Sequence, residues 1–295
     1  MQYNTIIIGG GVAGLTAGLY LGRAKVKTLI VEKGFLGGQV ALLNKVDNYP
    51  AIPSSSGFDI ADNLVKQVKQ YDIDFATEQV IEVSKNKEFI VKTNKNTYSA
   101  KHIIVATGTK TNNLGLSNEK KFTGRGVSYC VSCDANFFKN KSVALVGNGK
   151  SAIQDINYLQ NLASKVFWIV PNKELKESNQ LNSCKNVEII KSSEIIDLIG
   201  DNMLSAIKIY DKVKNKTFNL EVDGLFVQVG RQPDTSWLNV DVKKDKYGGL
   251  IVNKNCQTTC KGMFACGDIV SRKLKQIVVA CSDGAIASSY IIANN

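Results

Sequence analysis

The first feature of the chain is a repeated order of apolar and glycine-rich segments. The stretch NTIIIGGGVAGLTAGLYLGRAKVKTLIVEK begins with a β-branched run, passes through glycines into an apolar segment, and closes in a second run that ends at Glu32. The stretch SVALVGNGKSAIQDINYLQNLASKVFWIVPNK repeats this order, and its residues Ile153, Ile156, Leu159 and Leu162 recur three apart. Such spacing places them on one face of a helix. The pattern therefore predicts two βαβ units with parallel strands.

A second repeated pattern indicates that whole domains are duplicated. EFIVKTNKNTYSAKHIIVATGTK predicts a hairpin around residues 94–96 followed by a buried strand, and SAIKIYDKVKNKTFNLEVDGLFVQVGR has the same plan. The later stretch GMFACGDIV adds one more strand that ends at Gly267 and Asp268. We therefore predict a discontinuous first domain, residues 1–112 and 244–295, and a second domain, residues 113–243.

The first glycine turn has the spacing of a dinucleotide-binding site. Gly9, Gly11 and Gly14 form G-x-G-x-x-G directly after the first apolar run. Glycines there permit a tight turn and let a pyrophosphate approach the positive end of a helix. Glu32 ends the next strand, where a carboxylate accepts a hydrogen bond from a ribose hydroxyl. The fold class predicted is α/β, with two Rossmann-like, three-layer domains of the FAD/NAD(P)-binding type.

Composition and charge narrow the class of protein. The 295 residues are 44% hydrophobic and 21% charged, and the formal net charge is +11, which favours acidic partners. The lysines are scattered, without an Arg-rich arm, so nucleic-acid binding is not expected. The N-terminal apolar run lacks the basic start of a signal peptide, and no later run reaches the length of a membrane span. We expect a cytoplasmic protein.

The seven cysteines do not have the pattern of a secreted disulfide framework, because their number is odd. The chain has a single histidine, His102, so no metal site is expected. Only Cys130 and Cys133 have the C-x-x-C spacing. The others are expected to be small core residues, namely Cys184, Cys256, Cys260, Cys266 and Cys281.

The stretch GVSYCVSCDANFF is the candidate redox site. Two intervening residues let the sulfurs of Cys130 and Cys133 meet across one turn, and a helix beginning here would lower a thiol pKa. Asp134 follows directly and is the leading acid/base candidate in a chain with so little histidine. The alternatives are half of a zinc site, which the chain has no second C-x-x-C to complete, and a pair of structural thiols.

Taken together, these segments resemble the low-molecular-weight thioredoxin reductases over the whole chain. The resemblance is carried by IIIGGGVAGLTA, GGQV, VDNYP, VATG, GRGVSYCVSCD, LFVQVGRQPDT, FACGDI and KQIVVACSDGAIA. It implies FAD in the first domain, the C-x-x-C in the second, a homodimer, and thioredoxin or a thioredoxin-like protein as partner. The residues it implies for the FAD site are Gly9, Gly11, Gly14, Glu32, Gly38, Gln39, Asn48, Gly108, Asp268 and Gln276.

The resemblance also implies a route for the electrons. Reduced flavin passes two electrons to the Cys130–Cys133 disulfide, the Cys133 sulfur lies nearer the flavin, and Asp134 handles the proton. Cys130 then attacks the disulfide of a thioredoxin through a mixed disulfide.

The electron donor is a separate question, because the second glycine turn lacks its usual partner. Gly147, Gly149 and Ala152 keep a G-x-G-x-x-A pattern, but Val170 stands as far from Gly147 as Glu32 does from Gly9. Valine cannot accept from a ribose hydroxyl, which removes the usual support for NADH. The family's H-R-R-x-x-x-R motif for NADPH is replaced by the segment VPNKELK, residues 170–176, in which only Lys176 keeps a charge in register.

Two donors are therefore considered. Without these arginines the chain resembles the ferredoxin-dependent flavin thioredoxin reductases, a branch that lacks the nucleotide-specificity residues. The net charge of +11 would attract an acidic ferredoxin. Arg272, Lys273 and Lys275 are candidates for its docking patch. The retained glycine turn, with Lys173 and Lys176, leaves NADPH as the alternative. A flavin-dependent ferredoxin–NADP reductase would lack the C-x-x-C, and a non-enzymatic flavin sensor is the remaining alternative.

Overall fold

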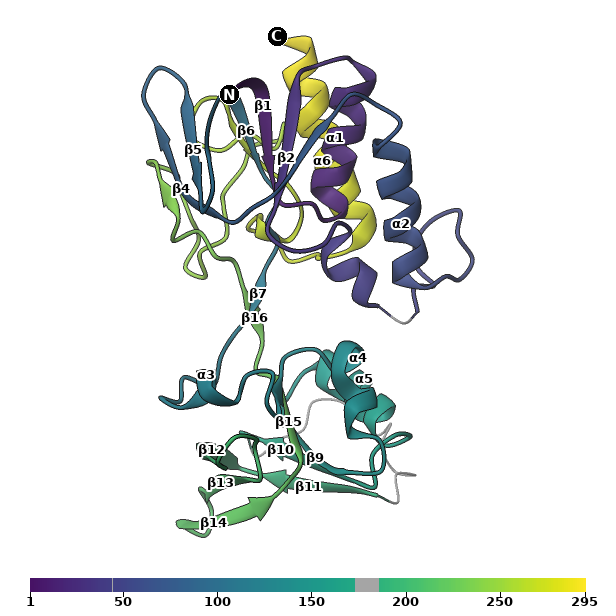
Figure 1. Ribbon diagram of the computed structural model, residues 1–295, viewed down its shortest axis with the longest axis vertical. Helices are drawn as coiled ribbons and strands as arrows, with labels where there is room; N and C mark the ends of the chain where they lie inside the picture. Colours follow the sequence, from purple (N-terminus) through teal and green to yellow (C-terminus); the bar gives the residue numbers. More distant parts are fainter. Residues whose placement is uncertain (44, 173–185) are drawn as a thin grey trace. The chain divides into compact units, whose positions relative to one another are not determined.

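The computed structural model describes residues 1–43, 45–172 and 186–295, and the chain forms two compact units (Figure 1). The first comprises Met1–Lys110 and Gln232–Asn295, and the second Thr111–Arg231. β7 (Lys110–Thr111) and β16 (Arg231–Gln232) pair where the chain passes between units. The second boundary thus lies earlier than the predicted 243/244, because residues 232–243 include β17 (Leu238–Asn239), which pairs with β4 (Val80–Lys85) of the first unit.

The first unit is built on a mixed sheet with the order β17-β4-β5-β6-β1-β2-β3. β6, β1, β2 and β3 run parallel, as the βαβ pattern predicts, and β18 pairs in parallel with the second half of β6. β4, β5 and the first half of β6 are antiparallel, with the predicted hairpin between β5 and β6. The strands are β1 (Gln2–Ile8), β2 (Thr28–Glu32), β3 (Asp74–Thr77), β4 (Val80–Lys85), β5 (Phe89–Thr93), β6 (Thr97–Val105) and β18 (Met263–Ala265).

Helices cover one face of this sheet, and the alternation of β1 explains the layering. Ile7 packs among helical residues such as Leu15, whereas Ile6 and Ile8 pack on the other face with Phe89 of β5. Successive strand residues face opposite sides, so both faces of β1 are buried. Figure 1 shows α1 and α6 side by side. The helical segments are α1 (Val12–Arg23), η1 (Gly38–Leu42), α2 (Gly57–Val68), η4 (Gly267–Ile269) and α6 (Ile277–Ala293).

The second unit has a parallel sheet and a smaller antiparallel one. The parallel order is β11-β10-β9-β15-β8, and the antiparallel order is β12-β13-β14. The parallel strands are β8 (Val127–Ser128), β9 (Ser142–Gly147), β10 (Lys165–Val170), β11 (Val187–Lys191) and β15 (Gly224–Gln228). The antiparallel strands are β12 (Ser193–Ile199), β13 (Ala206–Asp211) and β14 (Lys216–Glu221).

The parallel sheet of the second unit lies between two layers. Ile153 and Ile156 of α5 pack on one face around Trp168, while Ile169 faces the antiparallel strands on the other. α5 ends at Leu159, so Leu162 lies in the turn that follows the helix. The helical segments are α3 (Glu119–Phe122), α4 (Val131–Asp134), η2 (Ala135–Phe138) and α5 (Lys150–Leu159). The predicted α/β class with two Rossmann-like domains is confirmed.

Candidate active site

The first glycine turn connects β1 to α1, and its backbone admits only glycine at two positions. Gly9 has φ +108°, and a Cβ there would lie 2.4 Å from the carbonyl oxygen of Ala106. A Cβ on Gly14 would lie 1.9 Å from the oxygen of Gly9. A Cβ on Gly11, by contrast, would have no atom of the described residues within 4 Å. The turn therefore leaves open space at the N-terminus of α1, which suits a pyrophosphate.

Glu32 lies beside this turn because β1 and β2 are in parallel register. Ile8 pairs with Val31, so the next residue of β2 reaches the glycines. Its Oε2 accepts a hydrogen bond from the N–H of Gly10 at 2.7 Å, and its Oε1 accepts one from the N–H of Gly34 at 2.9 Å. Glu32 is half-buried. Each carboxylate oxygen has a second lone pair, which can accept from a ribose hydroxyl in the role predicted for it.

Several other predicted FAD residues gather near the same turn. A Cβ on Gly38 would lie 3.0 Å from the Cα of Gly11. The Nε2 of Gln39 donates to the carbonyl oxygen of Thr109 at 2.8 Å, directly after Gly108. These contacts join η1, the end of β6 and the start of α1, which are distant in sequence.

Asn48 and Gln276 form a separate contact. The Nδ2 of Asn48 donates to the Oε1 of Gln276 at 3.0 Å, and both side chains are exposed. All ten predicted FAD residues lie in the first unit. The assignment of each one to the cofactor stays a prediction.

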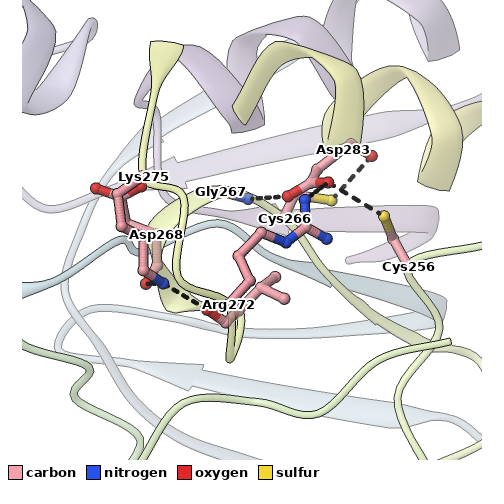
Figure 2. A network of polar contacts seen from close by, with 8 residues as sticks. Cys256, Cys266, Gly267, Asp268, Arg272, Lys275 and Asp283 are labelled. Carbon is pink, nitrogen blue, oxygen red and sulfur yellow. Dashed lines mark hydrogen bonds and ion pairs between the residues drawn. The ribbon is translucent and has the colours of Figure 1, made fainter. Parts of the chain in front are cut away.

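Figure 2 shows a polar network on the same unit that the sequence did not predict. Asp283 of α6 is 1% exposed and accepts from the backbone N–H of Gly267 at 3.0 Å and from the Nη1 of Arg272 at 2.7 Å. The thiol of Cys256 also reaches its Oδ1, at 3.6 Å. A signal was present in the sequence, because Asp283 is the only charged residue in α6.

The redox site is a disulfide between Cys130 and Cys133, with their Cα atoms 5.3 Å apart. Cys130 precedes α4 and Cys133 lies within it, and the N–H of Cys133 donates to the Sγ of Cys130 at 3.2 Å. Cys133 is exposed and Cys130 is half-buried. A disulfide that reaches the surface can be attacked by a thiolate from another protein.

Asp134 is held by a hydroxyl that the sequence did not single out. The Oγ of Ser128, which is buried, donates to the Oδ2 of Asp134 at 2.6 Å and accepts from the N–H of Cys130 at 3.0 Å. A hydrogen bond to a carboxylate is stronger than one between neutral groups. Ser128 thus joins the proposed acid/base to the backbone of the dithiol segment.

The strands around the second glycine turn pair in the same register as those around the first, but the residue beside the turn is different. β9 and β10 pair Val146 with Ile169, so Val170 occupies the place that Glu32 has beside the first turn. Val170 is fully buried and offers no acceptor, and the Nε1 of Trp168 donates to the oxygen of Gly147 at 2.9 Å. A Cβ on Gly149 would have no described atom within 4 Å, so the described residues leave space at the start of α5.

The structure describes only some of the other predicted residues. Lys173, Lys176 and Cys184 lie outside the described residues. Two of the three cations in the candidate docking patch are bonded within the first unit. Arg272 is bound to Asp283, and the Nζ of Lys275 donates to the carbonyl oxygen of Asp268 at 2.9 Å.

Of the remaining described cysteines, two lie in the core and two at its edge. Cys256 and Cys266 are buried, and Cys260 and Cys281 are partly exposed. Burial and the neighbouring Cys256 raise the pKa of the Cys266 thiol. Its S–H donates to the carbonyl oxygen of Asp283 at 3.3 Å. Among the described residues there is no cluster of His, Cys, Asp or Glu suited to a metal ion, and no helix long and apolar enough to cross a membrane.

A dinucleotide-type fold with a surface disulfide defines a flavin-linked disulfide oxidoreductase. Residues 3–284 match the family described as pyridine nucleotide-disulphide oxidoreductase. A thioredoxin reductase of Listeria monocytogenes is 37% identical over 97% of this chain and 91% of its own. The chain belongs to the thioredoxin reductases of this family, and FAD is its cofactor.

Solved structures agree with this assignment. The thioredoxin reductase of Lactococcus lactis is 26% identical, with a TM-score of 0.88 over 99% of this chain and 100% of that one. A ferredoxin-flavin thioredoxin reductase of Clostridium acetobutylicum is 27% identical, with a TM-score of 0.55 over 99% of this chain and 98% of that one. The family likeness therefore extends across both units.

Proposed function

We propose that this chain reduces the disulfide of a thioredoxin or thioredoxin-like protein through Cys130 and Cys133. The observation that carries the proposal is the accessible disulfide, with the Asp134 carboxylate joined through the Ser128 hydroxyl to the backbone of Cys130. FAD bound to the first unit, once reduced by the electron donor, would supply the two electrons that open this disulfide. Two protons complete the dithiol, and Asp134 exchanges one of them with a cysteine sulfur.

The dithiol then reduces the partner in two exchange steps. The thiolate of Cys130 attacks one sulfur of the partner's disulfide, forming a mixed disulfide and releasing the other partner sulfur as a thiolate. The thiolate of Cys133 attacks the Cys130 sulfur, which restores the internal disulfide and releases the reduced partner. Exposure does not support this order, because Cys133 is more exposed than Cys130, the proposed attacking residue. The order rests on the family resemblance.

Single-cysteine variants test this proposal and the order together. Cys133→Ser keeps Cys130 and should form a stable mixed disulfide with thioredoxin, seen as a covalent adduct by mass spectrometry. Cys130→Ser should form little adduct. Both variants should keep FAD, visible in the flavin absorbance, and lose turnover. An adduct only with Cys130→Ser would reverse the order, and full turnover in either variant would refute the dithiol route.

We propose the FAD site from the ten residues placed in the first unit. The open space at Gly11 would take the pyrophosphate, and Glu32 would bind a ribose hydroxyl. Gly38, Gln39 and Gly108 adjoin that turn, while Asn48, Asp268 and Gln276 belong to the same unit. Loss of flavin in variants of these residues is the test.

For the electron donor we propose a reduced ferredoxin, an acidic iron–sulfur protein. The support is the segment VPNKELK, residues 170–176, which has neither the acid that an NADH site uses nor the arginines that an NADPH site uses, together with the net charge of +11. The thioredoxin reductase relatives do not add support, since their names give no donor. NADPH is the second candidate, favoured by the family's pyridine-nucleotide name and by the space kept at Gly149.

Flavin bleaching under anaerobic conditions separates the two donors. Reduced ferredoxin supplied in an amount sufficient to reduce both the disulfide and the flavin should bleach the flavin within seconds, and the same number of electron equivalents from NADPH or NADH should not. Prompt bleaching by NADPH with none by ferredoxin would establish NADPH instead. We also propose a cytoplasmic homodimer, as the resemblance implies, and light scattering of the holoenzyme would measure the mass that tests the dimer.

A further inference from the structure

We infer that Asp283 and Arg272 are positioning residues of the FAD site, which rests on the proposed role of Asp268 and Gln276. Their ion pair joins α6 to the loop between η4 and α6 (Figure 2). That loop is flanked by the two proposed FAD residues. Neither Asp283 nor Arg272 is among the ten residues assigned to the cofactor.

The carboxylate of Asp283 is bonded from three sides. Its Oδ2 accepts from the N–H of Gly267, and its Oδ1 accepts from the guanidinium of Arg272 and the thiol of Cys256. A buried carboxylate is costly unless it is paired and hydrogen-bonded. Both oxygens of the Asp283 carboxylate accept hydrogen bonds, and one of the three donors is the backbone N–H of Gly267, directly before Asp268.

The position of Asp283 is fixed by the contact between α6 and α1. Gly284 follows Asp283, and a Cβ there would lie 2.4 Å from the carbonyl oxygen of Ala13. The two helices therefore approach backbone to backbone in the first turn of α1, next to the glycine turn. Asp283 holds Gly267 relative to this contact, so it sets the position of Asp268 relative to the pyrophosphate turn.

A second cation closes the other end of the loop. The Nζ of Lys275 donates to the carbonyl oxygens of Asp268 and Val270, at 2.9 Å and 2.5 Å. Gln276 comes next in the chain. Arg272 and Lys275 together tie the loop to α6 and to η4, which restricts its motion when FAD is absent. Such preorganisation increases ligand affinity because less order must be imposed on binding.

The thiol of Cys256 takes part in this network as a hydrogen-bond donor. It donates to Asp283, and Cys266 donates to the carbonyl oxygen of the same residue. Both thiols must be protonated to do so. The raised pKa of Cys266, caused by burial and by Cys256, agrees with this state. The two cysteines therefore stabilise the flavin-binding segment, and Cys266, whose thiol pKa is raised by burial, is a poor nucleophile.

The test is FAD affinity rather than turnover. Asp283→Asn puts an amide NH₂ against either Gly267 or Arg272, so one donor faces another. Diluting the holoenzyme and following free-flavin fluorescence gives the FAD dissociation constant. We expect Asp283→Asn to raise that constant at least about tenfold, which corresponds to ~1.4 kcal/mol. Arg272→Met should weaken FAD similarly, and Arg272→Lys should restore part of the affinity.

The matched control is Glu78→Gln. Glu78 is also a buried carboxylate of the first unit with three side-chain donors, but these are Thr93, Asn96 and Tyr98 at the β5–β6 hairpin. Thermal melting by circular dichroism measures the stability loss of each variant. The control should lose stability and keep its FAD dissociation constant within about threefold.

The outcomes separate the inference from its premise. A dissociation constant within about threefold of wild type in both Asp283→Asn and Arg272→Met would overturn the inference. An equal rise in Glu78→Gln would do the same, because the effect would then be general destabilisation. Asp268→Asn tests the premise separately, since unchanged FAD affinity there would refute the proposed site. If Asp283→Asn does not fold, the partly exposed Arg272 series decides.

Discussion

Replacing Asp155 by asparagine should stabilise the second unit more at pH 8 than at pH 5. Asp155 lies in α5, next to the buried Ile156. Burial raises its pKa from 3.8 to about 7. The folded protein therefore keeps a proton on this carboxyl over a pH range in which the unfolded chain has lost it. Asparagine has the same shape and does not ionise.

The magnitude follows from the difference between the two pKa values. At ~1.4 kcal/mol per pKa unit, the rise from 3.8 to about 7 corresponds to a ceiling of about 4 kcal/mol. Because the folded state binds more protons, the free energy of unfolding falls as pH rises from about 4 to about 7 and stays low above that. Between pH 5 and pH 8, Asp155→Asn should therefore gain about 2 to 3 kcal/mol relative to wild type.

Urea unfolding at pH 5 and pH 8 measures this gain. Trp168 is buried in the core on which α5 packs, and a Trp237→Phe background leaves it as the only tryptophan. Asp201→Asn, on an exposed aspartate of the same unit, is the control and should show no pH-dependent gain. A stability difference for Asp155→Asn that is equal at both pH values, within about 0.5 kcal/mol, would contradict the reasoning.

Three further changes have defined expectations. Ser128→Ala removes the hydroxyl that holds Asp134 and should lower kcat for thioredoxin about tenfold at unchanged KM, whereas Ser128→Thr should keep most of the rate; a change in KM alone would contradict this role. Gly14→Ala forces a Cβ to within 1.9 Å of the Gly9 oxygen and should lower both thermal stability and bound flavin, while Gly11→Ala, which has room in the protein, should lower only bound flavin. Iodoacetamide at pH 8 should leave Cys266 unlabelled in the native protein, because burial raises its pKa, and rapid labelling seen by peptide mass spectrometry would disprove its protonated, buried state.

The parts of the structure that sequence predicted are those governed by local rules. The glycine turns follow from backbone angles that other residues rarely adopt, and the place of Glu32 follows from the length of β2. Val170 is as far from Gly147 in the chain as Glu32 is from Gly9, and this equal spacing predicted its place beside the second turn. The meeting of the sulfurs of Cys130 and Cys133 also depends only on one short turn of the chain.

The parts that were missed depend on contacts between distant segments. Nothing in the spacing distinguishes Arg272, which pairs with Asp283, from an exposed surface cation. The second boundary was displaced because β17 has only two residues and no hydrophobic alternation of its own. Ser128 looked like any polar residue beside a dithiol, and only the fold brings its hydroxyl to Asp134.

The most direct test of the central claim is independent of the electron donor. The holoenzyme, reduced anaerobically with two electrons per flavin from dithionite and freed of excess reductant, is mixed with one equivalent of oxidised thioredoxin. Counting the thiols of thioredoxin after separation should give close to two per reduced enzyme in wild type. Neither thiol should appear with a Cys130→Ser, Cys133→Ser double variant that retains FAD. Equal thiol yields from the wild type and the double variant would contradict a route through this dithiol.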